Sequence, residues 1–133
     1  MNKVVAVSGY FDPIHVGHIE YLEMASSLGD RLVVIVNNDH QASLKKGKSF
    51  MTENDRVKIV ASLKCVDKAF LSIDTDSTVA KSLHAVKPDI FANGGDRSNK
   101  EIPEALVCTE LGITIIDGLG DKIRSSSDYT GLK

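Results

Sequence analysis

The sequence predicts an α/β protein built on one parallel β-sheet with helices on both faces. Short β-branched runs alternate along the chain with segments of helical periodicity, and the connections between them are short. Runs such as RLVVIV are apolar without interruption, which is typical of a parallel strand covered on both sides. Because parallel strands are joined by right-handed crossovers, the intervening helices are expected on both faces of a single sheet.

Five strands and four helices are expected in alternation. Gly29 is expected to cap the first helix, and Thr52 with Asp55 to cap the second in a capping-box-like arrangement. Between these helices, residues 41–50 (QASLKKGKSF) are basic and interrupted by Gly47, so we expect a mobile loop there. The strands are expected at 4–9, 31–36, 68–73, 88–95 and 113–117, and the helices at 16–29, 52–63, 77–86 and 101–112.

Composition limits the classes of function. With 133 residues and 42% hydrophobic side chains, the chain can bury one core, and one domain is expected. The formal charge of -2 predicts no broad attraction to nucleic acid or to a membrane surface. Cys65 and Cys108 lack metal-ligand spacing and are expected to be buried thiols. The N-terminus lacks a signal-peptide pattern, so a soluble cytoplasmic protein is expected.

Two histidines follow the first predicted strand, in the stretch GYFDPIHVGH. Ligands of open parallel sheets bind beyond the carboxyl ends of the strands, which places His15 and His18 at the mouth of such a site. Imidazoles beside a helix N-terminus can donate hydrogen bonds to phosphate oxygens as negative charge grows. A simple capping role for His15 is the structural alternative. With Asp12 as the nearby carboxylate, the pair makes only an incomplete metal site.

The motif Gly-x-Phe-Asp followed by His-x-Gly-His resembles the signature of the cytidylyltransferase-like nucleotidyltransferase superfamily. The resemblance extends through VNNDHQASLKKGK, ENDRVKIVASLKCVD, KPDIFANGGD and IRSSS. It is closest to the small bacterial group of glycerol-3-phosphate cytidylyltransferase and heptose-phosphate adenylyltransferase. The resemblance implies that residues 1–133 form a single Rossmann-like nucleotidyltransferase domain. It also implies Mg²⁺ bound mainly through nucleotide phosphates, and a homodimer.

Site residues follow from the resemblance. His15 and His18 are expected to stabilise the transferring phosphoryl group, and Lys46 to reach the phosphates, with Lys45 and Lys48 as competing candidates. Nucleotide-binding residues are expected in the first loop, at the start of the second predicted helix, after the fourth strand and in the C-terminal serine segment. They are Gly9, Tyr10, Phe11, Asp12, Gly17, Arg56, Asn93, Gly94, Gly95, Asp96, Arg124, Ser125, Ser126 and Ser127.

The expected reaction transfers a cytidylyl group from CTP to a small phosphate- or phosphonate-bearing acceptor, with release of pyrophosphate. Adenylyl transfer from ATP to a sugar phosphate or similar acceptor is the alternative. The claim for CTP is weakened by Leu119, which stands where the cytidylyltransferase branch of the family usually has an arginine. A regulatory module that binds nucleotide without turnover is a third hypothesis. Neither nucleic acid nor a membrane is an expected partner.

Overall fold

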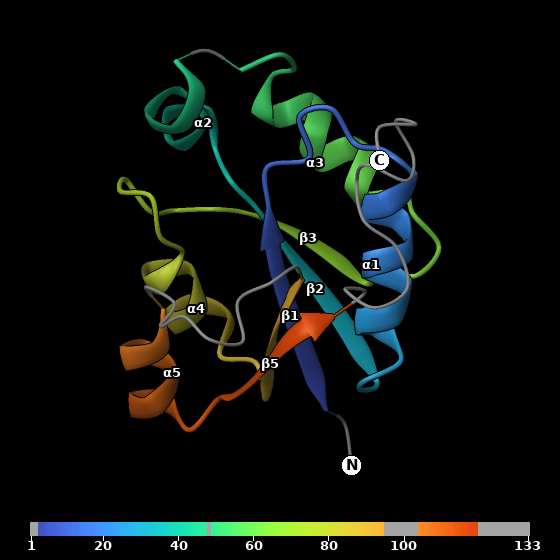
Figure 1. The fold of residues 1–133 in the computed structure, drawn as a ribbon, viewed down its shortest axis with the longest axis vertical. Helices are drawn as coiled ribbons and strands as arrows, with labels where there is room; N and C mark the ends of the chain where they lie inside the picture. The colour runs from blue at the N-terminus through green and yellow to red at the C-terminus, as the bar shows by residue number, and fades with distance from the viewer. Residues whose placement is uncertain (1–2, 48, 95–103, 120–133) are drawn as a thin grey trace.

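Five parallel strands form one sheet in the order β3-β2-β1-β4-β5. The computed structural model describes residues 3–47, 49–94 and 104–119. The strand order reverses at β1, because β2 and β3 lie on one side of it and β4 and β5 on the other (Figure 1). The strands are β1 (Val4–Gly9), β2 (Arg31–Val36), β3 (Lys68–Leu71), β4 (Ile90–Gly94) and β5 (Thr114–Leu119).

Helices cover both faces of the sheet, as predicted (Figure 1). On one face, Leu22 of α1 and Val60 of α3 pack with strand residues in a first hydrophobic cluster. On the other face, Leu83 of α4 and Cys108 of α5 pack in a second cluster. The helices are α1 (Val16–Ser26), α2 (Asp39–Lys46), α3 (Glu53–Ala61), α4 (Ala80–Val86) and α5 (Ala105–Leu111).

Helix α2 occupies most of the segment for which a mobile basic loop was expected, so that prediction was wrong. The side chain of Asn38 accepts the N–H of Gln41 at 2.8 Å, and Gln41 Oε1 accepts the N–H of Asn38 at 3.1 Å. These two bonds form a capping box, which satisfies the free N–H groups at the start of a helix. Gly47, with φ of 82°, ends α2.

Gly29 does not cap α1, contrary to the sequence prediction. The helix ends at the C-cap Ser27, which keeps a right-handed backbone. Gly29 instead packs against the start of β1: a Cβ at this position would lie 2.8 Å from the carbonyl oxygen of Lys3 and 2.8 Å from Cγ2 of Val5. Close approach of two backbone segments, rather than helix termination, therefore requires this glycine.

Three aspartates fix the amino-terminal edge of the sheet. Asp30, Asp67 and Asp89 each accept a backbone N–H at or next to the start of a strand, at 2.7, 2.7 and 2.8 Å. The donors are the N–H groups of Lys3, Leu32 and Val4, respectively. These bonds satisfy backbone N–H groups that have no partner in the hydrogen bonding between strands, and they hold the register of neighbouring strands.

Cys108 is buried in the second cluster, as predicted, whereas Cys65 is only half-buried. Burial, with a smaller contribution from Glu104, raises the pKa of the Cys108 thiol to about 11, so this cysteine stays protonated at neutral pH. Within the described segments, no helix combines the length and the apolar character needed to cross a membrane.

The contact of Gly29 with β1 leads to a stability prediction. Gly29→Ala should lower the free energy of unfolding by about 1–3 kcal/mol, the usual effect of overpacking. Urea unfolding measures this effect, and Ser27→Ala, two residues away at an exposed position, is the control and should stay within about 0.5 kcal/mol of the parent. Equal stability of the two variants would contradict the packing role of Gly29.

Candidate active site

A cavity of about 560 Å³ lies at the carboxyl ends of β1, β2 and β4, where the strand order reverses. Open α/β sheets bind their ligands at such a reversal point. The lining combines the loop after β1 with residues from several other parts of the chain. It comprises Ser8, Gly9, Tyr10, Phe11, Asp12, Pro13, His15, His18, Tyr21, Asn37, Lys45, Ser77, Val79, Asn93 and Glu104.

The two motif histidines form a reciprocal cap at the start of α1. Nδ1 of His15 accepts the N–H of Gly17 at 3.1 Å, and Nδ1 of His18 accepts the N–H of His15 at 3.1 Å. An imidazole nitrogen that accepts a hydrogen bond carries no proton, so each neutral ring carries its proton on Nε2. The ring centroids lie 3.9 Å apart. The pair can therefore present two N–H donors to one ligand, and helix capping and ligand binding use different atoms of the same rings.

Phe11 packs against His18 of this pair. Its backbone is left-handed, with φ of 52°, an unfavourable conformation for a bulky residue. Its ring is 2% exposed and meets the ring of His18 edge-on, with centroids 5.1 Å apart. Gly9 makes room for this arrangement, because a Cβ at that position would lie 2.8 Å from Cζ of Phe11. Phe11 and Gly9 thus set the position of His18.

His18 stays neutral well below neutral pH. Burial, with a smaller contribution from nearby His15, lowers the pKa of His18 from 6.5 to about 4. A neutral imidazole still donates one hydrogen bond from Nε2, so the ring serves as a polar donor rather than as a fixed positive charge.

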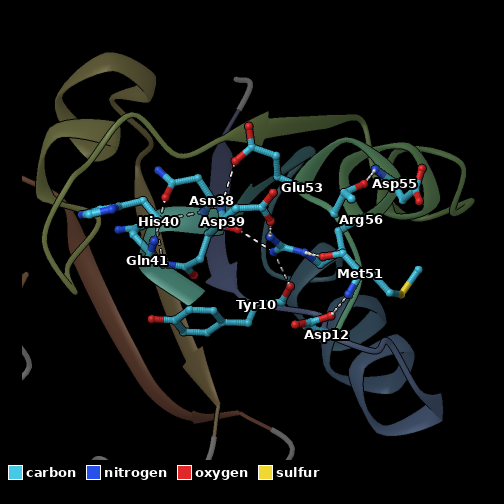
Figure 2. A network of polar contacts seen from close by, with 12 residues as sticks. Tyr10, Asp12, Asn38, Asp39, His40, Gln41, Met51, Glu53, Asp55 and Arg56 are labelled. Atoms are coloured by element: carbon cyan, nitrogen blue, oxygen red, sulfur yellow. Dashed lines mark hydrogen bonds and ion pairs between the residues drawn. The ribbon is translucent and has the colours of Figure 1, made fainter. Parts of the chain in front are cut away.

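Arg56 lies in the interior, with 1% of its surface exposed. Its guanidinium donates to the carbonyl oxygens of Met51 at 3.0 Å, Tyr10 at 2.9 Å and Asn37, and it pairs with the carboxylate of Asp39 at 2.7 Å (Figure 2). These acceptors come from three segments: the loop after β1, the β2–α2 region and the residues before α3. Four N–H groups of a buried cation are thereby satisfied within the chain.

The carboxylate of Asp12 is directed toward the backbone before α3. Oδ2 accepts the N–H of Phe50 at 2.7 Å. Oδ1 accepts the N–H of Met51 at 2.6 Å (Figure 2). Asp12 thus ties the histidine-bearing loop to the segment that enters α3. Within the described residues, no three His, Cys, Asp or Glu side chains group closely enough to hold a metal ion.

The cavity wall beside α4 and α5 carries a buried carboxylate, that of Glu104. Glu104 is 7% exposed, and its Oε2 accepts the N–H of Val79 at 3.0 Å. Burial, and then the charge of Glu104, raise the pKa of the Tyr10 phenol above its ordinary 10.0, so Tyr10 keeps its proton. The ammonium of Lys45 lies 4.6 Å from the centroid of the Tyr10 ring, a cation–π contact.

Seven of the residues predicted from the sequence meet at the cavity: Gly9, Tyr10, Phe11, Asp12, His15, His18 and Asn93. Two predicted residues lie outside its lining. Gly17 holds His15 through its N–H, and Arg56 lies in the interior behind the site. Gly94 ends β4. The side chain of Lys46, and the predicted residues Gly95, Asp96, Arg124, Ser125, Ser126 and Ser127, lie outside what the structure describes.

Several lining residues were not predicted from the sequence, among them Asn37, Ser77, Val79 and Glu104. Asn37 directly follows β2, so the rule that ligands bind beyond strand ends could have found it. No such signal marks Ser77, Val79 or Glu104, because they reach the cavity only through the packing of α4 and α5 on the sheet.

This reversal-point cavity, with two imidazole donors at a helix start, is the kind of site that nucleotide-transferring enzymes use. The chain belongs to the cytidylyltransferase-like family, whose model matches residues 6–126. It is 40% identical over 103 residues to bifunctional protein HldE of Helicobacter pylori strain P12, covering 76% of this chain and 22% of that protein. It is 36% identical over 126 residues to HldE of Hahella chejuensis, covering 93% of this chain and 24% of that protein.

The chain therefore spans about a quarter or less of the length of these curated relatives. The family match confirms the resemblance found in the sequence motifs. Among solved structures, a lipopolysaccharide core biosynthesis protein from Thermoplasma volcanium matches with a TM-score of 0.72 and 33% identity, over 89% of this chain and 95% of that one. A pantoate-beta-alanine ligase from Francisella tularensis, at 16% identity and a TM-score of 0.55, shares the fold; the match covers 97% of this chain and 68% of that one.

The lowered pKa of His18 leads to a pH prediction. Because the unfolded imidazole binds a proton near pH 6.5 and the folded one only near pH 4, the unfolded state holds more protons between these values. His18 therefore contributes stability that is fully present above pH 6.5 and is lost as the pH falls toward 4. NMR titration of the imidazole should give a midpoint near 4, and the exposed His84 is the internal reference. A midpoint for His18 near 6.5 would contradict its buried, neutral state.

Proposed function

We propose that this protein transfers an adenylyl group from ATP to a small phosphate-bearing acceptor, in the first place a sugar phosphate, and releases pyrophosphate. The observation that carries the proposal is the histidine pair. The Nδ1 atoms of His15 and His18 are both occupied by backbone N–H groups, so two Nε2–H donors remain for the phosphates of a nucleotide. Donors held in this way stabilise charge that develops during phosphoryl transfer.

The sequence favoured CTP as the donor, and the comparisons support the ATP alternative better. The similarity to HldE proteins supports adenylyl transfer in this proposal. Cytidylyl transfer remains the competing reaction, because the family is described by that activity. The two reactions share one mechanism and differ in the base that the cavity accepts, so a direct comparison of donors separates them.

The proposed reaction is an in-line displacement. An oxygen of the acceptor phosphate attacks the α-phosphorus of the nucleotide, and the bond from that phosphorus to the oxygen bridging to the β-phosphate breaks, so pyrophosphate leaves. The attacking phosphate is already anionic near neutral pH, so no general base is required. Alignment of the two substrates and the Nε2–H donors of His15 and His18 lower the barrier. Mg²⁺, held mainly through the nucleotide phosphates, would neutralise part of their charge.

The charges in the cavity favour one orientation of the substrates. The buried carboxylate of Glu104 repels phosphate, whereas the Nε2–H groups of His15 and His18 can donate hydrogen bonds to it. We therefore place the phosphates beside α1 and the hydroxyl-bearing or amine-bearing part of a substrate beside α4 and α5, where a carboxylate can accept hydrogen bonds.

The histidine role is tested by separating capping from catalysis. In His18→Asn, the amide oxygen can replace Nδ1 as acceptor for the N–H of His15, but no group remains at the position of Nε2. We expect the variant to fold normally and to lose roughly two to three orders of magnitude in kcat, the effect of one lost transition-state donor. Pyrophosphate release measures turnover, and His84→Asn, on the exposed side of α4, is the matched control.

The same assay, run as a screen of ATP, CTP, GTP and UTP against phosphate and phosphonate acceptors, tests the reaction itself. ATP with a sugar phosphate should give the highest kcat/KM. A preference for CTP would replace the proposal by cytidylyl transfer. Nucleotide binding with no pyrophosphate release from any pair would favour a regulatory module.

A second prediction concerns Lys45, Lys46 and Lys48. The resemblance assigns the phosphate contact to Lys46, and the geometry supports Lys45, which lines the cavity. Each lysine is replaced by alanine in a separate variant. Replacement of the lysine that contacts phosphate should raise the nucleotide KM roughly tenfold, the effect of losing one charge-assisted hydrogen bond. Lys48→Ala should change it less than about twofold. Three equal KM values would indicate that these lysines form only a solvated basic surface.

A further inference from the structure

Helix α2 is held on the molecule mainly by polar contacts. Neither hydrophobic cluster contains a residue of α2. Among its described side chains only Gln41 and Ala42 are buried, and Leu44 is 54% exposed. Apolar burial, which holds the other four helices on the sheet, therefore contributes little to the position of α2.

The polar anchors of α2 gather at its first turn and before it. The carboxylate of Asp39 pairs with Arg56 at 2.7 Å, and the N–H of Asp39 donates to Oε1 of Glu53 at 2.8 Å (Figure 2). Nδ2 of Asn38 and Nε2 of Gln41 donate to backbone carbonyls between β3 and α4. The opposite end of α2 carries Lys45, which lines the cavity. Because Lys45 belongs to the same short helix, its position depends on how the first turn is held.

One side chain links this first turn to the histidine-bearing loop. The guanidinium of Arg56 holds the Asp39 carboxylate and, on Nη1, the carbonyl oxygen of Tyr10 at 2.9 Å. Its planar fork fixes the directions of these bonds as well as their lengths. The guanidinium is therefore a rigid link between the first turn of α2 and the loop that carries His15 and His18, in addition to the contact of Lys45 with the Tyr10 ring.

We propose that Arg56 is a positioning residue: through Asp39 it fixes helix α2, and with it Lys45, against the histidine-bearing loop. In this role Arg56 does not bind the nucleotide, although the sequence resemblance assigned it to nucleotide binding. The consequence for catalysis rests on the proposed function, whereas the structural role does not.

The test uses Asp39→Asn, because variants of the buried Arg56 can fail to fold. This change keeps the shape of the side chain and removes the charge that faces the guanidinium. The matched control is Asp55→Asn, which removes an equal charge from the first turn of α3, where the side chain is exposed. Both variants lose the same favourable interaction with a helix dipole, so their difference reports the Arg56 contact.

Hydrogen exchange of the amides of residues 42–46 gives the first readout. We expect exchange in α2 to become roughly tenfold or more faster in Asp39→Asn than in the parent, because a buried cation loses its counter-charge. Amides of β1 and β2 should keep their protection, and Asp55→Asn should leave α2 unchanged. Unchanged protection of α2 in Asp39→Asn, or an equal loss in every element, would overturn the proposal.

Kinetics give the second readout. Asp39→Asn should raise the nucleotide KM about tenfold with kcat changed less than about threefold, since it displaces a binding lysine and leaves the histidines in place. Combined with Lys45→Ala, it should add little, because both changes remove the same contact. A raised KM with unchanged α2 protection would mean that Arg56 acts on the nucleotide directly, and would overturn the positioning role. Absence of turnover with every donor would overturn the proposed function alone, because the exchange result needs no substrate.

Discussion

A full positive charge in the interior is the constraint around which this site is arranged. Arg56 is 1% exposed, and a cation without partners there would be very unfavourable. The chain meets this requirement with carbonyl oxygens from three segments and one carboxylate. Because each acceptor must approach to hydrogen-bond distance, the loops at the carboxyl end of the sheet are drawn together. The loop after β1 and the residue after β2, which both line the cavity, thus converge on one guanidinium.

Each ring of the histidine pair also serves two purposes. Nδ1 of each ring satisfies a backbone N–H at the start of α1, and this bond fixes both the ring orientation and its tautomer. Phe11 then limits how far the ring of His18 can turn. The donors that face the cavity are therefore ordered before any substrate arrives, which is what electrostatic catalysis requires. The geometry of His15 is therefore compatible both with helix capping and with ligand binding.

Much of the fold could be predicted from the sequence because its signals are local. The apolar runs of β1 and β2 and the cap of α3 at Thr52 are readable from neighbouring residues. Helix α2 was missed because residues 41–50 are basic and interrupted by Gly47, and the capping pair of Asn38 and Gln41 was not recognised as a helix start. Its polar sequence gave no hydrophobic periodicity to reveal it, because α2 packs on polar groups.

The site was predictable where it is continuous in sequence and not where packing assembles it. Residues 9–18 bring six of the predicted residues to the cavity, since one loop carries them. Glu104, the residue before α5, lines the same cavity, and nothing near it in the sequence indicates this. Arg56 was predicted from its position in the family motif, but only the fold shows that its charge is directed into the interior.

The aspartates at the amino-terminal edge of the sheet have a consequence for how such a protein can change over evolutionary time. Asp30, Asp67 and Asp89 set strand register at the edge opposite the cavity. Substitutions in the loops that line the cavity therefore need not shift one strand past another. A chain organised in this way can exchange one acceptor for another through changes in loop sequence, while the scaffold beneath stays the same.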